Sequence, residues 1–131
     1  MKREPLPPDC WHYPLPDGFT ALAGKTDADN DQLSLKTARP NDHWFHLSGQ
    51  PGSHVILQHP DNAPPSRDIL RAAAAIAAWH SKARHASKTT IHYTQAKHVT
   101  KPRGAKPGTV QIQHAKTLKV APALPTQQPD P

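Results

Sequence analysis

Proline sets the strongest limit on how this chain can fold. Sixteen of its 131 residues are proline, and proline fixes φ and removes a backbone donor, so it interrupts helices and central strands. Many of these prolines gather near the two ends of the chain. We therefore expect an extended, flexible arm over residues 1–16, one ordered domain over residues 17–120, and a disordered tail over residues 121–131.

One segment of the ordered part has the periodicity of a long helix. Pro64 and Pro65 precede Ser66, whose hydroxyl can accept the free amides of a first helical turn. Apolar residues then recur at helical spacing, which predicts a helix that runs to about Arg84. Many of its residues are alanine, so it presents a thin face that can lie close against a sheet.

Short strand patterns lie on both sides of this helix. They are rich in β-branched or aromatic residues, or they alternate polar and apolar side chains. The predicted strands cover residues 19–22, 32–36, 42–47, 55–57, 90–93, 110–112 and 118–120. Strands, one long helix and further strands predict an α+β fold, with a small mixed or antiparallel sheet and the Ala-rich helix packed on one face.

Charge is divided unevenly along the chain. The formal net charge is +6, yet residues 1–68 contain more acids than bases, and residues 69–129 contain no acid at all. Soluble surfaces usually mix both signs. An acid-free stretch of this length indicates a polyanionic partner such as nucleic acid, and the alternative is a chance bias in a basic protein.

Cysteine usage and hydropathy limit where such a protein works. Cys10 is the only cysteine, which excludes a disulfide framework or a multi-cysteine zinc site and suits the reducing cytosol. Residues 1–5 lack the apolar stretch of a signal peptide, and no apolar run approaches transmembrane length. We expect a cytoplasmic protein with no membrane partner and no cofactor.

Basic residues gather around a loop that is rich in proline and glycine. The loop covers residues 101–108, where Gly104 and Gly108 let the backbone approach a phosphate and expose its amides. Cations on phosphates give affinity without sequence choice. The predicted RNA contacts are Lys97, Lys101, Arg103 and Lys106, with Lys82 and Arg84 at the helix end. The alternatives are a solvated loop, and cations that only complement the helix dipole.

The predicted strand over residues 42–47 offers a second kind of contact. Alternation places Trp44 on the face opposite the core-like Phe45. An indole on that face can stack on an unpaired base, and the alternative is packing against the Ala-rich helix.

Two histidines and an aspartate accompany this tryptophan. His46 and His54 are predicted to hydrogen-bond RNA, and Asp42 is predicted to orient His46 or to accept from a base or a 2′-hydroxyl. A buried structural pair of Asp42 and His46 is the alternative.

A series of short motifs resembles one known family. Residues 42–46 are similar to its D-x-W-F-H motif, and residues 51–55 to its P-G-S-H-V motif. Further similar pieces are Gly24-Lys25 with Asn30, Asp31 and Leu33, then Ala72-Ala73, residues 81–84, Tyr93-Thr94, Lys97, Val99, Lys101-Pro102, residues 104–108 and residues 116–118. The ordered series spans residues 18–122 and resembles the NFACT-R (NFACT RNA-binding) domain of ribosome quality-control factors.

This resemblance implies an RNA-binding domain with tRNA or large-subunit rRNA as its partner. It also implies a link to ribosome-associated quality control. Long members of the family carry further domains that handle tRNA and nascent chains. What the resemblance implies for these 131 residues, as a stand-alone bacterial-type member, is the RNA contact.

Other functions fit fragments of the sequence. His43, His46, His54 and His59 invite a metal site, but His43 and His46 point to opposite faces of a strand and no HExxH is present. Asp42 and His46 with Ser48, Ser53 or Ser81 can be drawn as a hydrolase triad, but G-x-S-x-G is absent. We predict no metal site and no catalytic residue. An RNA-processing or RNA-modifying enzyme that uses Asp42, His46 and His54 is one alternative, and a protein-binding adaptor that uses the proline-rich ends is another.

Overall fold

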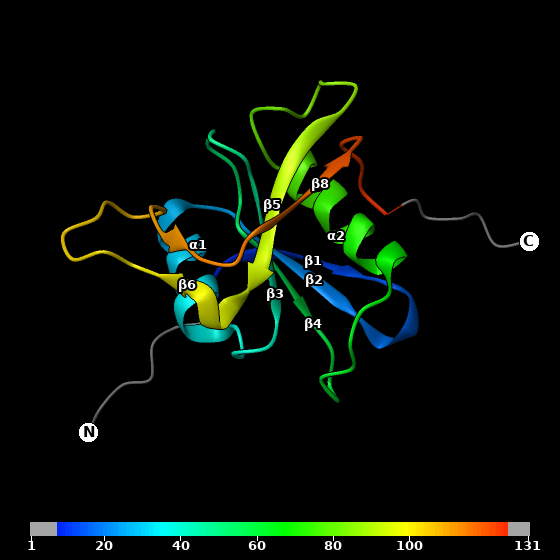
Figure 1. Ribbon diagram of the computed structural model, residues 1–131, viewed down its shortest axis with the longest axis horizontal. Helices are drawn as coiled ribbons and strands as arrows, with labels where there is room; N and C mark the ends of the chain where they lie inside the picture. Colours follow the sequence, from blue (N-terminus) through cyan, green and yellow to red (C-terminus); the bar gives the residue numbers. More distant parts are fainter. Residues whose placement is uncertain (1–7, 126–131) are drawn as a thin grey trace, which may run out of the picture.

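Six strands form one antiparallel sheet at the centre of the molecule (Figure 1). The computed structural model describes residues 8–125. The strand order is β1-β2-β4-β3-β5-β8. The strands are β1 (Cys10–Pro14), β2 (Thr20–Gly24), β3 (His43–Leu47), β4 (Val55–Gln58), β5 (Thr89–Gln95) and β8 (Lys116–Val120). The predicted α+β class is confirmed, and the sheet is antiparallel throughout.

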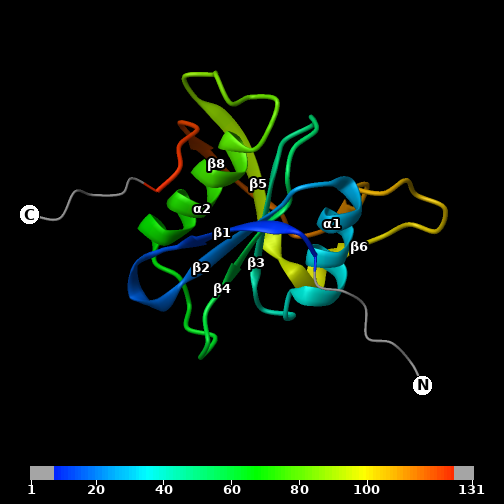
Figure 2. The same ribbon diagram turned by 180° about the vertical axis from the view of Figure 1, so that it is seen from behind.

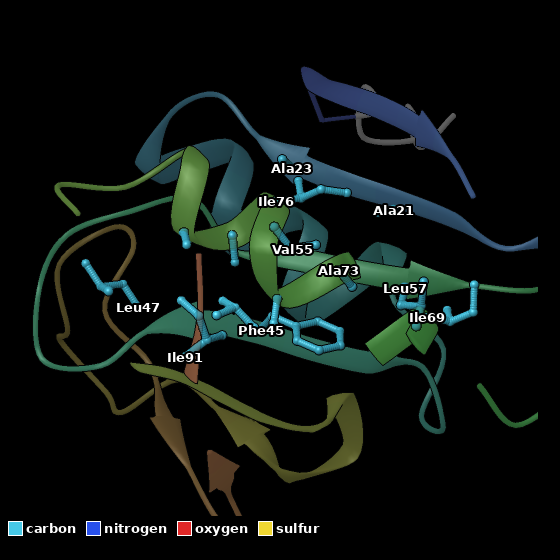
Figure 3. Packing of buried hydrophobic residues seen from close by; sticks show 14 of the residues in the cluster. Ala21, Ala23, Phe45, Leu47, Val55, Leu57, Ile69, Ala73, Ile76 and Ile91 are labelled. Atoms are coloured by element: carbon cyan, nitrogen blue, oxygen red, sulfur yellow. The ribbon is translucent and has the colours of Figure 1, made fainter. Parts of the chain in front are cut away.

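Helix α2 (Arg67–Trp79) covers one face of this sheet (Figure 2). Ser66 caps it as predicted, because its Oγ accepts from the amide of Ile69 at 3.2 Å. Small alanine side chains bring the helix against Phe45 and Val55 in the main core (Figure 3). Burying these apolar side chains between helix and sheet stabilises the fold.

The helix is shorter than predicted, since it ends at Trp79 and not near Arg84. At His80 the backbone leaves the helical region, with φ −90° and ψ 43°. Its carbonyl accepts from the amide of Ser53 at 2.8 Å, and Ser81 pairs with Gly52 in a β-bridge. The chain after Trp79 therefore bonds to the turn between β3 and β4, and this pairing replaces further helical turns.

The other face of the sheet is covered by α1 (Asp27–Gln32), which continues into the wide turn η2 (Leu33–Thr37). A strand predicted over residues 32–36 is therefore wrong. Thr26 begins the helix with a capping box: its Oγ accepts from the Asp29 amide at 3.1 Å, and the Asp29 carboxylate accepts from the Thr26 amide at 3.1 Å. This local signal and the complete burial of Leu33 outweigh a five-residue alternation.

A small hairpin closes this second face. It consists of β6 (Val99–Thr100) and β7 (Gln111–Ile112), and the basic loop connects the two strands. Two short 3₁₀ turns, η1 (Pro16–Gly18) and η3 (Ala96–His98), complete the elements. Among the described residues, α2 covers one sheet face, and α1, η2 and this hairpin lie over the other.

The ends of the chain differ from the expected arm and tail. Strand β1 lies inside the predicted arm, yet residues 10–14 pair with β2 in the sheet. An edge strand tolerates the proline at its end, which is why a proline-rich segment can join the sheet here. After β8, the Ala123 amide donates to the Ala75 carbonyl at 3.2 Å. The outer parts of the predicted flexible ends, residues 1–7 and 126–131, lie outside the described residues.

Candidate nucleic-acid interface

The basic loop between β6 and β7 is held against α1 by Lys101. Its ammonium lies 3.0 Å from Asp31 Oδ2 and donates to the carbonyls of Lys106 at 2.6 Å and Thr109 at 3.0 Å. An ammonium has three donors, and all three are occupied by these groups. In this structure Lys101 closes the loop on itself and on the helix, and its RNA contact stays a prediction.

Gly108 is engaged by the same helix. Its amide donates to Asp31 Oδ1 at 3.0 Å, so a carboxylate stands where the predicted phosphate would bind. Its φ is +85°, and a Cβ at this position would lie 2.9 Å from Asp27 Oδ1. The need for glycine here comes from close packing. Gly104 also has a positive φ, +78°, but its surroundings are open, so a phosphate contact at its amide stays a prediction.

The exposed cations of this loop are Arg103 and Lys106. Neither forms an ion pair within residues 8–125. Lys97, also exposed, donates to the side chain of Asn41 at 3.3 Å. Arg103 and Lys106 are therefore the loop cations best placed to meet a phosphate.

Trp44 lies on the predicted face of β3 but is 1 % exposed. It packs in a second apolar cluster with Leu22 and Leu33, on the face away from α2. Its Nε1 donates to Ser34 Oγ at 2.9 Å. Both expectations for Trp44, stacking on a base and packing against the Ala-rich helix, are wrong, because α1 and η2 cover this face.

His54 belongs to the same buried network. Ser34 Oγ lies 2.7 Å from His54 Nδ1, and the His54 amide donates to Asn30 Oδ1 at 3.1 Å. Burial first, and the nearby His46 second, lower the pKa of His54 to about 4. With 1 % of its surface exposed, His54 holds α1 to β4, and its predicted RNA contact is wrong.

His46 is partly buried beside His54, with ring centroids 5.1 Å apart. Burial lowers the pKa of His46, and a backbone hydrogen bond with Gly52 opposes this effect. Its ring lines a hollow of about 520 Å³ that Gly49 and Gly108 also line. An RNA contact through His46 stays a prediction.

Asp42 is buried, and its carboxylate stabilises the turn before β3. Its carboxylate accepts from the Arg39 amide at 2.9 Å, pairs with Arg39 Nε at 3.7 Å and accepts from Gln58 Nε2 at 3.4 Å. These partners replace His46, so the predicted orienting role and the alternative Asp–His pair are both wrong.

A second hollow, of about 430 Å³, lies where the end of α2 meets the β3–β4 turn. Lys82 and Arg84 line it, together with Lys25 and Trp11. Its base is tight, because a Cβ on Gly52 would lie 2.7 Å from the Cβ of Ser81. Asp27, Pro51 and Gly52 line both hollows, so the two adjoin at this turn.

Trp11 is the residue of this hollow that sequence reasoning missed. It stacks on His80 with ring centroids 4.1 Å apart and 11° between the planes. Tyr13, two residues along β1, places its hydroxyl 2.6 Å from His80 Nε2. The aromatic residues at positions 11 and 13 have the spacing of one strand face, a signal that the assignment to an arm concealed.

Two kinds of site are not found in the described part of the chain. No group of three or more His, Cys, Asp or Glu residues among residues 8–125 could hold a metal ion. Over the same residues, no helix has the length and apolar character needed to cross a membrane.

A family comparison covers the residues that line both hollows. The sequence profile described as "NFACT protein RNA binding domain" matches residues 10–114. This chain belongs to the NFACT RNA-binding domain family. The match includes both hollows, and it begins at Cys10, so β1 and Trp11 are part of the NFACT domain and not of an arm that precedes it.

Relatives of this NFACT domain are much longer proteins. The "Rqc2 homolog RqcH" of Streptococcus suis is 42 % identical over 111 residues, which are 84 % of this chain and 20 % of the relative. The protein of the same name from Bacillus subtilis is 37 % identical over 125 residues, 95 % of this chain and 21 % of the relative. The chain therefore spans about a fifth of the length of these curated relatives.

A solved structure has the same NFACT fold. It is the C-terminal part of the fibronectin/fibrinogen-binding protein from Streptococcus suis, with a TM-score of 0.81 and 36 % sequence identity. The similarity covers 92 % of this chain and 47 % of that one. The resemblance inferred from short motifs is thus confirmed at the level of the family and its fold.

Proposed function

We propose that this NFACT domain binds structured RNA, tRNA or large-subunit rRNA, through its phosphates, and works in ribosome-associated quality control. The family description and the relatives named Rqc2 homolog RqcH support this proposal. Such RNA is cytoplasmic, and the proposal assigns no catalytic step to the domain.

The observation that carries the proposal is that two hollows adjoin at the β3–β4 turn and that exposed cations belong to the segments that line them. Lys82 and Arg84 line the hollow on one side of this turn. The loop that carries Arg103 and Lys106 lines the adjoining hollow through Pro107 and Gly108. Cations spread over one rim can contact several phosphates of a folded RNA at once, which gives affinity without base readout.

Equilibrium binding of the chain to bulk tRNA and to large ribosomal subunits at low salt tests this function. We expect Arg103→Ala/Lys106→Ala to weaken binding several-fold, because two exposed cations are lost. An Arg67→Ala/Lys119→Ala variant removes the same charge at exposed positions that line neither hollow. Arg67 begins α2, about 18 Å from Trp79 at its other end at a rise of ~1.5 Å per residue.

The control variant should bind nearly as well as the parent. Equal weakening of both variants would mean that net charge alone drives binding. Failure of the parent to bind either RNA at low salt would overturn the proposed function.

Protein binding is a second candidate, suggested by the name of the solved relative, a fibronectin/fibrinogen-binding protein. Immobilised fibronectin and fibrinogen test it with the same variants. Binding that resists moderate salt and is unaffected by Arg103→Ala/Lys106→Ala would favour this candidate over RNA.

A further inference from the structure

We infer that the hollow beside Trp11 receives one unpaired nucleotide of the bound RNA, with its base stacked on the indole and its phosphate held by Lys82 and Arg84. This inference rests on the proposed function, because it names the part of the RNA that this rim takes. It goes beyond phosphate contacts, because they do not need the indole of Trp11.

Trp11 is the exposed large hydrophobic side chain of the described residues, with 38 % of its surface accessible. It lies on the edge strand β1, where it faces the hollow and not the core. An indole is the side chain that stacks best on a base, and stacking tolerates every base because each has a π-face. An exposed, fixed indole beside cations is therefore a platform for an unstacked base.

The platform is fixed before any ligand arrives. His80 lies parallel to the indole at 4.1 Å, and Tyr13 holds His80 through the 2.6 Å contact with Nε2. A ring already held in one orientation loses little conformational entropy when a base stacks on it. Nothing fits between two rings at this separation, so a base must use the face of the indole that His80 leaves open.

Lys25 lies next to the indole of Trp11, outside the stack with His80. Lys25 Nζ lies 5.3 Å from the indole centroid and 3.3 Å from Asp9 Oδ1. Both partners of this ion pair are exposed, so the pair contributes little and can be displaced. An incoming base can take the place of the ammonium, which can then turn to a phosphate.

Lys82 and Arg84, which also line the hollow, suit the phosphate of the same nucleotide. Lys82 is exposed, and the guanidinium of Arg84 is held 5.0 Å from the Trp79 ring while its Nε donates to the Trp79 carbonyl at 2.6 Å. The hollow measures about 430 Å³, within the range of about 300–1,000 Å³ for small-ligand sites. Its lining combines one aromatic platform with three cations against a single carboxylate, that of Asp27. This size and this balance favour a nucleotide over a peptide side chain.

Two RNAs of equal length separate this inference from the proposed function. One is a hairpin with unpaired loop bases, and the other is a blunt duplex without unpaired bases. We expect Trp11→Leu to bind the hairpin about five- to a hundredfold more weakly, which is the loss of one base–aromatic stack. Binding of the duplex should stay unchanged, because phosphate contacts do not need the indole.

Two further variants guard against a folding effect. Trp11→Phe should keep much of the hairpin affinity, since it keeps a ring, and His12→Ala, at the next and also exposed position of β1, should bind as the parent does. Hairpin binding by Trp11→Leu as tight as that of the parent, or an equal loss for hairpin and duplex, would overturn this inference alone. A parent that binds neither RNA would overturn the proposed function and this inference with it.

Discussion

At the scale of single residues, three polar groups explain why α1 lies where it does. Trp44 Nε1 donates to Ser34 Oγ, which leaves the hydroxyl proton of Ser34 for His54 Nδ1. His54 is then a neutral imidazole with its proton on Nε2. Every member of this buried chain has a partner, and a satisfied buried network fixes one arrangement of the elements that supply it.

Removing the central hydroxyl tests this network. Ser34→Ala leaves the Trp44 indole N–H and His54 Nδ1 without their partner, and each buried group left unpaired costs about 1–3 kcal/mol. We expect the free energy of unfolding to fall by roughly 2–4 kcal/mol in chemical denaturation. Ser87→Ala, at an exposed position, should change it by less than about 0.5 kcal/mol. A similar small effect for both serines would show that the network does not stabilise the fold.

The low pKa of His54 makes stability depend on pH. An unfolded histidine has a pKa near 6.5, whereas burial lowers the pKa of His54 in the fold to about 4. The unfolded chain therefore binds more protons between these values, so stability is complete above about pH 6.5 and falls towards pH 4. His80, whose pKa burial also lowers to about 4, acts in the same direction.

We expect His54 alone to account for a loss of roughly 3 kcal/mol between pH 7 and pH 4. His54→Asn, which keeps an acceptor for Ser34, should show a clearly shallower fall in the free energy of unfolding over this range. Urea denaturation at several pH values measures it. The same pH dependence in variant and parent would contradict the buried neutral imidazole.

At the scale of elements, α1 and the basic loop hold each other. Asp31 accepts from both Lys101 and the Gly108 amide, so one carboxylate fixes both ends of the loop. Fixing the base of the loop leaves its tip, with Arg103 and Lys106, free to meet a ligand. Lys101 contributes to the candidate interface by fixing the conformation of this loop.

Gly108→Ala tests this packing against a matched glycine. A positive φ costs an alanine about 1–2 kcal/mol at Gly108 and at Gly104 alike. Only at Gly108 would the new Cβ also meet Asp27, at 2.9 Å. We expect Gly108→Ala to lower the free energy of unfolding more than Gly104→Ala and to speed amide exchange in the loop. Equal effects of the two substitutions would contradict close packing of α1 on the loop.

Local sequence patterns predicted most helices and strands. They did not predict where α2 ends or that the segment around Leu33 is helical. Phe45 and Leu47 lie on the core face of β3 as their alternation indicates, and Ser66 caps α2. The segment around Leu33 alternates like a strand, yet the capping box at Thr26 makes it helical. The end of α2 depends on a bond to Ser53, far away in the sequence, which periodicity cannot reveal.

At the scale of the whole molecule, the sheet is covered on both faces. Two hollows adjoin at the β3–β4 turn, at the rim of this sheet. The uneven distribution of charge along the chain also serves the fold. Asp31, from the acidic first half, forms an ion pair with Lys101, from the basic second half. Sequence alone identified the basic half and the family, but it could not tell a cation bound within the fold from one left exposed.

The salt dependence of tRNA binding tests the central claim, that exposed rim cations bind phosphates, most directly. The logarithm of the affinity falls with the logarithm of the salt concentration by about 0.7–0.9 for each phosphate neutralised. We predict a steep slope for the parent and a slope shallower by about 3 when Lys82, Arg84, Arg103 and Lys106 are all alanine. An unchanged slope in this variant, or a parent whose binding hardly depends on salt, would contradict the account.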